Sequence, residues 1–282
     1  METENNAGIP PVKLSAQSRF NFRCHPGISC FTRCCRGINI MLTPYDIVRL
    51  KNRLQMTSEE FLAMYTTPQL LEKTDLPVVT LRMLDDQPGE PVCPFVREDA
   101  GCIIYADRPT TCRYYPLGVA SLSHKPEVAE GFYFFINEPH CKGFEEDAEW
   151  SVEEWRRDQG VDVYDSINAP WTELLVRKRS IPSNIRLTEK TKNMFFTASY
   201  DIDRFRRFVF ESSFLNLYQV DNETVAEIRN DELALLNFSF RWLKWLLFQE
   251  GDFQLNPEEA ESRRRRREEA GKSGGGPEME KS

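Results

Sequence analysis

Apolar residues recur along this chain at helical spacing in some segments and at strand spacing in others. In LTPYDIVRLKNRL, residues 42–54, Ile47, Leu50 and Leu54 recur at helical spacing behind Thr43. Threonine is a favoured helix cap, and the proline after it suits the first helical position. The pattern therefore predicts a helix that begins close to Thr43.

The middle of the chain has mainly the composition of strands. A capping box at 57–60 predicts one more short helix, and then PVVTLRML at 77–84 is rich in β-branched residues. GCIIY at 101–105 and the aromatic run at 128–136 are further strand candidates. No regular alternation of strands and helices is present. We therefore expect a small sheet and not a parallel βαβ fold.

From about residue 150 the pattern becomes helical. A capping box at 151–154 starts a helix that Gly160 is placed to end. The segments 195–220 and 231–248 alternate bulky residues with charged ones at helical spacing, RFRRFVF at 204–210 included. These segments predict helices, each with one apolar and one solvated face.

Together the patterns predict an α+β protein, in which a small irregular β and loop core packs with a mainly α-helical C-terminal part. Residues 1–20 have no periodic apolar face and predict a loose arm. A single domain is expected over 21–256, with its helical layer at 150–250. The low-complexity segment 257–282 has seven basic and seven acidic residues and predicts a disordered tail.

Composition narrows the class of protein. With 40% hydrophobic and 28% charged residues, the 282-residue chain is long enough to bury a core. No apolar run approaches the roughly 18 residues needed to cross a bilayer, so we expect no membrane partner. The net charge of −8 argues against nucleic acid as a partner. The N-terminus has no signal-peptide pattern, which favours a cytoplasmic location.

Eight cysteines carry the candidate chemistry. Disulfides are rare in a reducing compartment, so these residues indicate metal ligands or reactive thiols. All of them lie in the N-terminal half, within 22–141, and we predict that all eight ligate metal: Cys24, Cys30, Cys34, Cys35, Cys93, Cys102, Cys112 and Cys141.

The spacing of the cysteines favours iron–sulfur over zinc. The gaps are five, three, zero, fifty-seven, eight, nine and twenty-eight residues, and none is a C-x-x-C zinc knuckle. Iron–sulfur clusters take thiolates from scattered loops more readily. Eight thiols can furnish two four-ligand sites or one cluster with spare cysteines, and the sequence leaves this open.

Several residues beside the cysteines have two interpretations each. Arg23, Arg33, Arg36 and Arg113 each adjoin a cysteine, where they can offset thiolate charge or pair with carboxylates. His25 and His140 also adjoin cysteines, either as ligands or as donors to ligands, whereas His124 has no such context. Six nearby aromatic residues can form a dry shell or ordinary core: Phe22, Phe31, Phe95, Tyr105, Tyr114 and Tyr115.

Taken in order, these residues resemble the CxxCxxCC cysteine-cluster family of the YkgJ type, a zinc- or iron-chelating domain. The residues that resemble the first block of the family's pattern are Cys24, Cys30 and Cys34-Cys35, followed by Leu42-Thr43, Asp46 and Arg49-Leu50. Those that resemble the second block are Cys93-Pro94-Phe95, Gly101-Cys102, Ile104-Tyr105, Arg108-Pro109, Cys112-Arg113 and Pro116. The family usually opens with C-x2-C-x2-CC, and this chain has C-x5-C-x3-CC, which leaves the role of Cys24 open.

The resemblance implies one activity besides metal binding. Flagellin N-methylase carries the same cysteine cluster, so a lysine N-methyltransferase that uses S-adenosylmethionine is one alternative. The sequence shows no strand followed by a glycine-rich turn of the kind that binds nucleotide cofactors, and no catalytic residues can be named. Another alternative is an interaction module with a structural metal, in which the aromatic segment 238–248 docks a protein partner.

Overall fold

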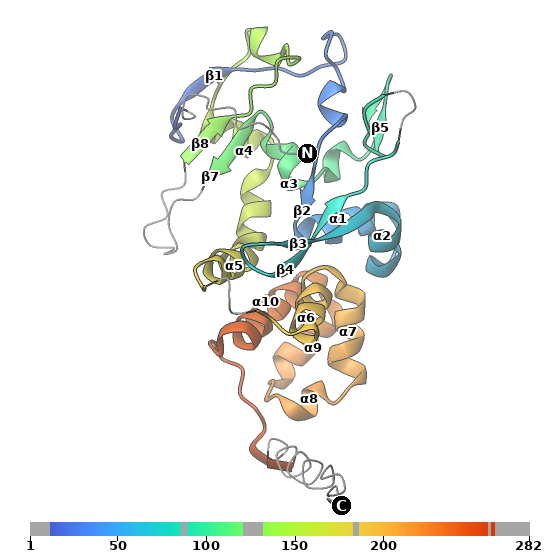
Figure 1. Cartoon of the computed structure of the whole chain (residues 1–282), viewed down its shortest axis with the longest axis vertical. Coiled ribbons are helices and arrows are strands. Elements are labelled where there is room, and N and C mark those ends of the chain that lie inside the picture. Colours follow the sequence, from blue (N-terminus) through green and yellow to red (C-terminus); the bar gives the residue numbers. More distant parts are fainter. Residues whose placement is uncertain (1–11, 86–88, 121–131, 183–185, 259–260, 263–282) are drawn as a thin grey trace, which may run out of the picture. The chain divides into compact units, whose positions relative to one another are not determined.

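The structure is a computed structural model that describes residues 12–85, 89–120, 132–182, 186–258 and 261–262. The chain divides into two compact units, Met1–Asp201 and Ile202–Ser282. All the named strands lie in the first unit and are antiparallel, and the second unit is helical (Figure 1). The α+β class is confirmed. The single domain over 21–256 stays a prediction.

A three-stranded sheet lies at one side of the first unit. Its order is β2 (Met41–Leu42), β4 (Leu76–Leu81) and β3 (Thr66–Leu71). The strand predicted at 77–84 is confirmed as β4, which is buried along most of its length. The sequence interpretation missed β3, because this edge strand is mostly exposed and contains a proline, as edge strands do.

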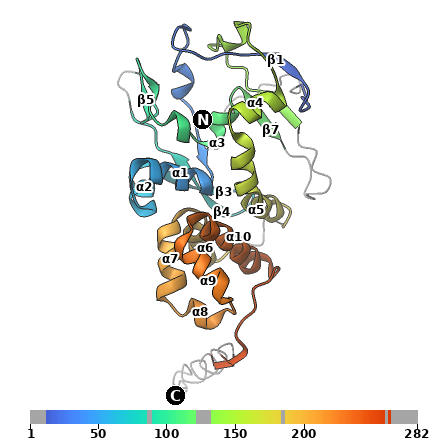
Figure 2. The same cartoon turned by 180° about the vertical axis from the view of Figure 1, so that it is seen from behind.

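Two helices precede β3 and β4 in the chain and lie beside them (Figure 2). The first is α1 (Pro44–Leu54) and the second is α2 (Ser58–Tyr65). Both begin with complete capping boxes, on Thr43 and Thr57, so both predicted starts are confirmed. The apolar face of α1 is buried, with Ile47 and Leu50 fully inaccessible to solvent.

Three two-stranded ladders complete the β-structure: β1 (Arg19–Asn21) with β9 (Glu149–Ser151), β5 (Val96–Arg97) with β6 (Gly101–Cys102), and β7 (Leu117–Ala120) with β8 (Phe132–Phe135). The strand predicted at 128–136 is present as β8, and residues 128–131 lie outside the described residues. Of GCIIY, only Gly101–Cys102 is strand. The chain then forms a 3-10 helix at Tyr105–Asp107. This helix ends before Arg108, because the residue that precedes a proline disfavours the helical conformation.

An aromatic and aliphatic cluster joins β1, β7 and α4 (Val152–Asp158). Phe22 packs edge-on against Trp155, with ring centroids 5.4 Å apart. A Cβ atom at Gly143 would lie 2.5 Å from the Phe22 ring, so only glycine fits there. Leu14 is buried in this cluster and its backbone pairs with Tyr133. The last residues of the segment predicted as a loose arm therefore pack on the core, and residues 1–11 lie outside the described residues.

Two more helices belong to the first unit: α5 (Val161–Arg179) and α6 (Glu189–Tyr200). The capping box at Ser151 is confirmed as the start of α4. Gly160 ends α4 as predicted, because its φ of +66° is a left-handed conformation that glycine adopts freely. Packing positions α6 against β4.

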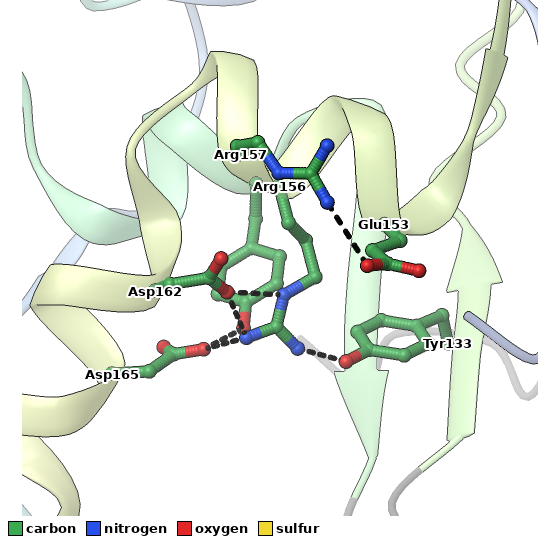
Figure 3. A network of polar contacts seen from close by, with 7 residues as sticks. Tyr133, Glu153, Arg156, Arg157, Asp162 and Asp165 are labelled. Atoms are coloured by element: carbon green, nitrogen blue, oxygen red, sulfur yellow. Dashed lines mark hydrogen bonds and ion pairs between the residues drawn. The ribbon is translucent and has the colours of Figure 1, made fainter.

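A charged network ties α4 to α5 and to β8 (Figure 3). Arg156 donates to Asp162 and Asp165 at 2.6 and 3.0 Å, and also to the Tyr133 hydroxyl. Asp165 also accepts from the Tyr114 hydroxyl. The network therefore fixes the short segment around Tyr114, which carries Cys112, to α5.

The second unit consists of α7 (Ile202–Glu211), α8 (Phe214–Leu217), α9 (Asn222–Asn230) and α10 (Glu232–Phe248). The helices predicted at 195–220 and 231–248 are confirmed, although the first is divided into α6, α7 and α8. Within RFRRFVF, Phe205 and Val209 are buried while Arg204 and Arg207 are exposed, as predicted for one apolar and one solvated face. Among the described residues, no helix is long and apolar enough to cross a membrane.

Candidate metal centre

Five segments of the first unit carry the cysteines, and all eight cysteines are free thiols. The first four lie in an irregular loop that ends in a 3-10 helix at Arg33–Cys35. Cys93 precedes β5, Cys102 lies in β6 and Cys112 lies in α3 (Thr110–Tyr114). Cys141 precedes a 3-10 helix at Gly143–Glu145.

Backbone hydrogen bonds bring the two sequence blocks together. The Cys93 amide donates to the Cys35 carbonyl at 2.9 Å, and the Gly37 amide donates to Pro91 at 2.8 Å. On the other side of the loop, the Lys142 amide donates to the Cys30 sulfur at 3.2 Å. Residues more than fifty positions apart in sequence therefore meet around one loop.

The charges of the thiols influence one another, and we name two overlapping groups of four that Cys34 connects. Cys24 interacts with Cys30, Cys34 and Cys141, and we call these four the first quartet. Cys112 interacts with Cys93 and Cys102, and Cys35 interacts with Cys93 and Cys112; these four are the second quartet. The quartets are not separate, because the adjacent Cys34 and Cys35 side chains interact with each other and Cys34 also interacts with Cys93, Cys102 and Cys112.

Burial and crowding make most of these thiols hard to ionise without a cation. Burial first, and then the neighbouring thiols, raise the pKa of Cys24 to about 11. Burial likewise raises the pKa of Cys93 to about 11 and raises the pKa values of Cys102 and Cys112. Cys34 is the exception, because its hydrogen bond with Cys35 lowers its pKa. A bound metal cation reverses this balance, because thiolate is the form that ligates metal.

Backbone amides act on several of the cysteines. The Lys142 amide donates to the Cys30 sulfur at 3.2 Å. The backbone amides of Phe95 and Ile104 act to lower the pKa values of Cys93 and Cys102, although burial keeps both values raised. Such hydrogen bonds stabilise the charge on metal-bound sulfur and tune clusters. Thiols are the donors that structural zinc and iron–sulfur clusters take, so the chemistry of these side chains suits such a metal. In the described part of the chain, however, no three His, Cys, Asp or Glu side chains are arranged so as to hold an ion.

The helix that carries Cys112 is fixed by two residues of α1. The buried Asp46 carboxylate accepts from the Thr110 amide and hydroxyl, both at 2.8 Å, and from the Thr43 amide at 2.8 Å. One turn later, Arg49 forms an ion pair with Asp107. Asp46 and Arg49 both belong to the motif that the sequence shares with the cysteine-cluster family, and their function here is to position α3.

The arginines beside the cysteines have different functions from one another. Arg33 pairs with Glu90 at 3.2 Å and Arg36 pairs with Glu98 at 3.5 Å, whereas the side chain of Arg23 is exposed. Arg113 is buried and donates to backbone carbonyls, including that of Gln159 at 2.8 Å. Pairing with carboxylates is therefore confirmed for two of the four.

The arginine that acts on the thiols is Arg108, which does not adjoin a cysteine. It is 7% exposed, donates to the Tyr105 carbonyl at 2.6 Å and stacks on the Tyr105 ring. Its charge interacts favourably with Cys102 and Cys112. Adjacency in sequence missed it, because the turn at 105–109 brings it back toward the cysteines.

The histidines next to cysteines pair with glutamates. His25 Nε2 lies 3.2 Å from Glu146, and its Nδ1 accepts from the Gly27 amide at 3.2 Å. His140 Nε2 lies 3.1 Å from Glu138. Glu138 also acts on Cys34, and its place three residues before Cys141 is the signal that could have identified it. His124 lies outside the described residues.

The predicted aromatic shell is only partly present. Phe22 and Phe95 are buried, whereas Tyr105 is 60% exposed. Tyr115 lies beside Cys141, and burial together with that thiol raises the pKa of its hydroxyl. Tyr115 and Cys141 both pack against the aromatic cluster, and the ring centroids of Tyr115 and Phe22 are 6.0 Å apart.

Residues 23–142 match the model of the CxxCxxCC family, whose description is "putative zinc- or iron-chelating domain". The match spans all eight cysteines and confirms the resemblance that the sequence predicted, including a metal-chelating cysteine cluster. No curated protein and no solved structure matches the chain. The YkgJ-type naming, the relationship to flagellin N-methylase and a site for S-adenosylmethionine stay predictions.

Proposed function

We propose that the protein binds a metal centre through all eight cysteines, with an iron–sulfur cluster, of the [4Fe–4S] type, as the first choice and zinc as the second. The observation that carries the proposal is that five segments bring eight free thiols near enough for most of them to influence one another's charge, and we propose that they act as two quartets. Each quartet has the number of thiolates that a [4Fe–4S] cluster or a structural zinc ion requires.

Two further observations support the proposal. The Lys142 amide donates to the Cys30 sulfur, and the buried Arg108 places its positive charge near Cys102 and Cys112 of the second quartet. Both features stabilise anionic sulfur. When bound, an iron–sulfur cluster supplies electron transfer, and zinc supplies a structural cross-link.

The direct experiment is anaerobic purification followed by iron, zinc and sulfide analysis and a visible absorption spectrum. We expect about two metal centres per chain, and a brown protein with sulfide if the centres are iron–sulfur. Colourless protein that contains zinc without sulfide would select the second choice. Metal-free protein that folds normally would contradict both.

Substitutions test the division into quartets. Cys34→Ser changes the first quartet and Cys112→Ser changes the second, so each variant should lose about half of the bound metal and the double variant nearly all of it. Deletion of residues 257–282, which contain no cysteine, is the matched control and should retain all of it. Full metal in both single variants would overturn the ligand assignment.

A further inference from the structure

A basic hollow opens beside the first quartet, between the cysteine loop and the segment His140–Lys142. It has a volume of about 470 Å³, and Cys30 forms part of its wall. Three cations line it, Arg33, Arg36 and Lys142, against a single carboxylate, Glu98. In a chain with a net charge of −8, this is a local excess of positive charge.

The wall of the hollow is held in place by its neighbours. The hydrogen bond from the Lys142 amide to the Cys30 sulfur closes one side. Phe31 packs against Gly101, where a Cβ atom would lie 2.8 Å from the ring. Between Phe31 and Arg33, Thr32 has a φ of +65°, a left-handed conformation that is unfavourable for a β-branched residue. Such strain persists only where the surrounding structure fixes it, and it concentrates at functional sites.

The carboxylates that pair with these cations in the structure should compete only weakly with a bound anion. Arg33 pairs with Glu90 at 3.2 Å, and both side chains are about half exposed. Lys142 pairs with Glu145 at 2.7 Å, and the glutamate is 66% exposed. Glu98, one partner of Arg36, is 87% exposed. Exposed pairs of this kind are weak, so one anion that contacts several of the cations can replace them.

We propose that this hollow binds a small anionic ligand, one that carries a carboxylate or phosphate group, next to Cys30. Its volume lies within the roughly 300–1,000 Å³ that is typical of small-molecule sites. Two guanidinium groups and an ammonium group suit both anions, since arginine donates to each in a forked geometry. The proposal goes beyond metal binding and does not depend on which metal the cysteines hold.

The test is calorimetric titration of the full-length protein, as purified with its metal, at constant ionic strength. Inorganic phosphate and succinate are the two probes, and they distinguish phosphate from carboxylate ligands. We expect saturable binding of at least one. Arg33→Gln and Lys142→Met should each weaken it about tenfold, the loss of one charge-assisted contact. Lys142→Met keeps the backbone amide that donates to Cys30.

Arg19→Gln is the matched control, because Arg19 is similarly exposed and paired, with Glu149, but does not line the hollow. It should leave the affinity unchanged. Absence of saturable binding of either anion, or an equal loss in Arg19→Gln, overturns the proposal. The proposal is also overturned if Arg33→Gln and Lys142→Met lose metal but keep their anion affinity. That result would mean that these cations only offset the charge of the thiolates. Metal analysis of the same samples reads out metal binding separately.

Discussion

In the second unit, Phe205, Phe208 and Phe214 surround the indole of Trp242, with ring centroids 5.6–5.7 Å away. The segment 105–114 of the first unit, which carries Cys112, is held instead by Asp46, Arg108 and Arg113, and the hydrogen-bond partners of these side chains are largely main-chain groups. One region is stabilised by apolar burial and the other by directional polar contacts. If the cysteines hold metal as proposed, the cysteine region is therefore the one that its removal should affect.

The largest effect should follow removal of the metal. Structural zinc contributes about 10–16 kcal/mol to small domains, so the cysteine region should lose most of its local stability when a chelator strips the metal. The aromatic second unit has no such dependence. Hydrogen exchange with peptide resolution should therefore show faster exchange over residues 93–114 and unchanged exchange over 232–248. Equal effects in both regions would remove the distinction between them.

Truncation of the central indole should have the opposite pattern. Trp242 is 3% exposed, and Trp242→Ala should cost about 3–5 kcal/mol of unfolding free energy in the second unit, by loss of packing. Metal content should not change. Denaturant unfolding followed by hydrogen exchange measures both.

Trp242→Phe is the control for this substitution. The indole N–H of Trp242 is buried and makes no hydrogen bond within the described part of the chain, so phenylalanine removes an unsatisfied donor while it keeps a ring. We expect this variant to lose much less stability than the alanine variant. A loss as large as that of alanine would mean that the ring packing is not what stabilises the unit.

Asp46 is the residue whose loss should affect the cysteine region most among the non-cysteine side chains. Asp46→Ala leaves the amides of Thr43 and Thr110 without their acceptor, which should cost about 2–3 kcal/mol and lower metal occupancy. Metal analysis and thermal unfolding of the same preparation give both quantities. Asp252→Ala, which removes an exposed partner of Arg241, is the control and should cost about 0–1 kcal/mol. Unchanged stability in Asp46→Ala would exclude the positioning role.

The contrast between the regions also explains which parts of the fold the sequence predicted. Helix starts at Thr43, Thr57 and Ser151 were correct because a cap acts within one turn of the chain. The role of Arg108 was missed because it depends on a turn that returns the chain toward Cys102, and no local pattern encodes such a contact. Helix α5 lies within the helical layer predicted at 150–250, but its bounds were not predicted, because it contains Pro170 and its apolar periodicity is weak.

The cysteine constellation shows the same limit. Sequence order identified all eight cysteines and the family motif, but left open whether they form one site or two. The structure adds the contacts that bring the cysteine segments together, from the Cys93 amide to the Cys35 carbonyl and from the Lys142 amide to the Cys30 sulfur. Both are contacts between residues far apart in sequence, so only the folded chain reveals them.

The smallest effect concerns Asp75, at the turn between β3 and β4. Its carboxylate accepts from the Leu187 amide at 2.8 Å and pairs with Lys192 at 3.0 Å and Arg186 at 3.4 Å. Burial raises the pKa of Asp75, but these three donors lower it more, and the net shift is downward. A lowered pKa in the folded state means that the stabilisation is present above the unfolded pKa of about 3.9 and is lost as the pH falls through the folded value.

Asp75→Asn should therefore lower the stability by about 1 kcal/mol at pH 7 and by progressively less below about pH 4, as the wild-type carboxylate is itself protonated. The difference in midpoint temperature between the two proteins, measured from pH 7 to pH 2.5, checks this expectation. Glu72→Gln changes an exposed carboxylate close to the same turn and should show no such trend. A difference in midpoint temperature that stays constant with pH would mean that Asp75 acts through its shape and not through its charge. Polar contacts in the first unit would then depend less on charge than the comparison with the aromatic second unit implies.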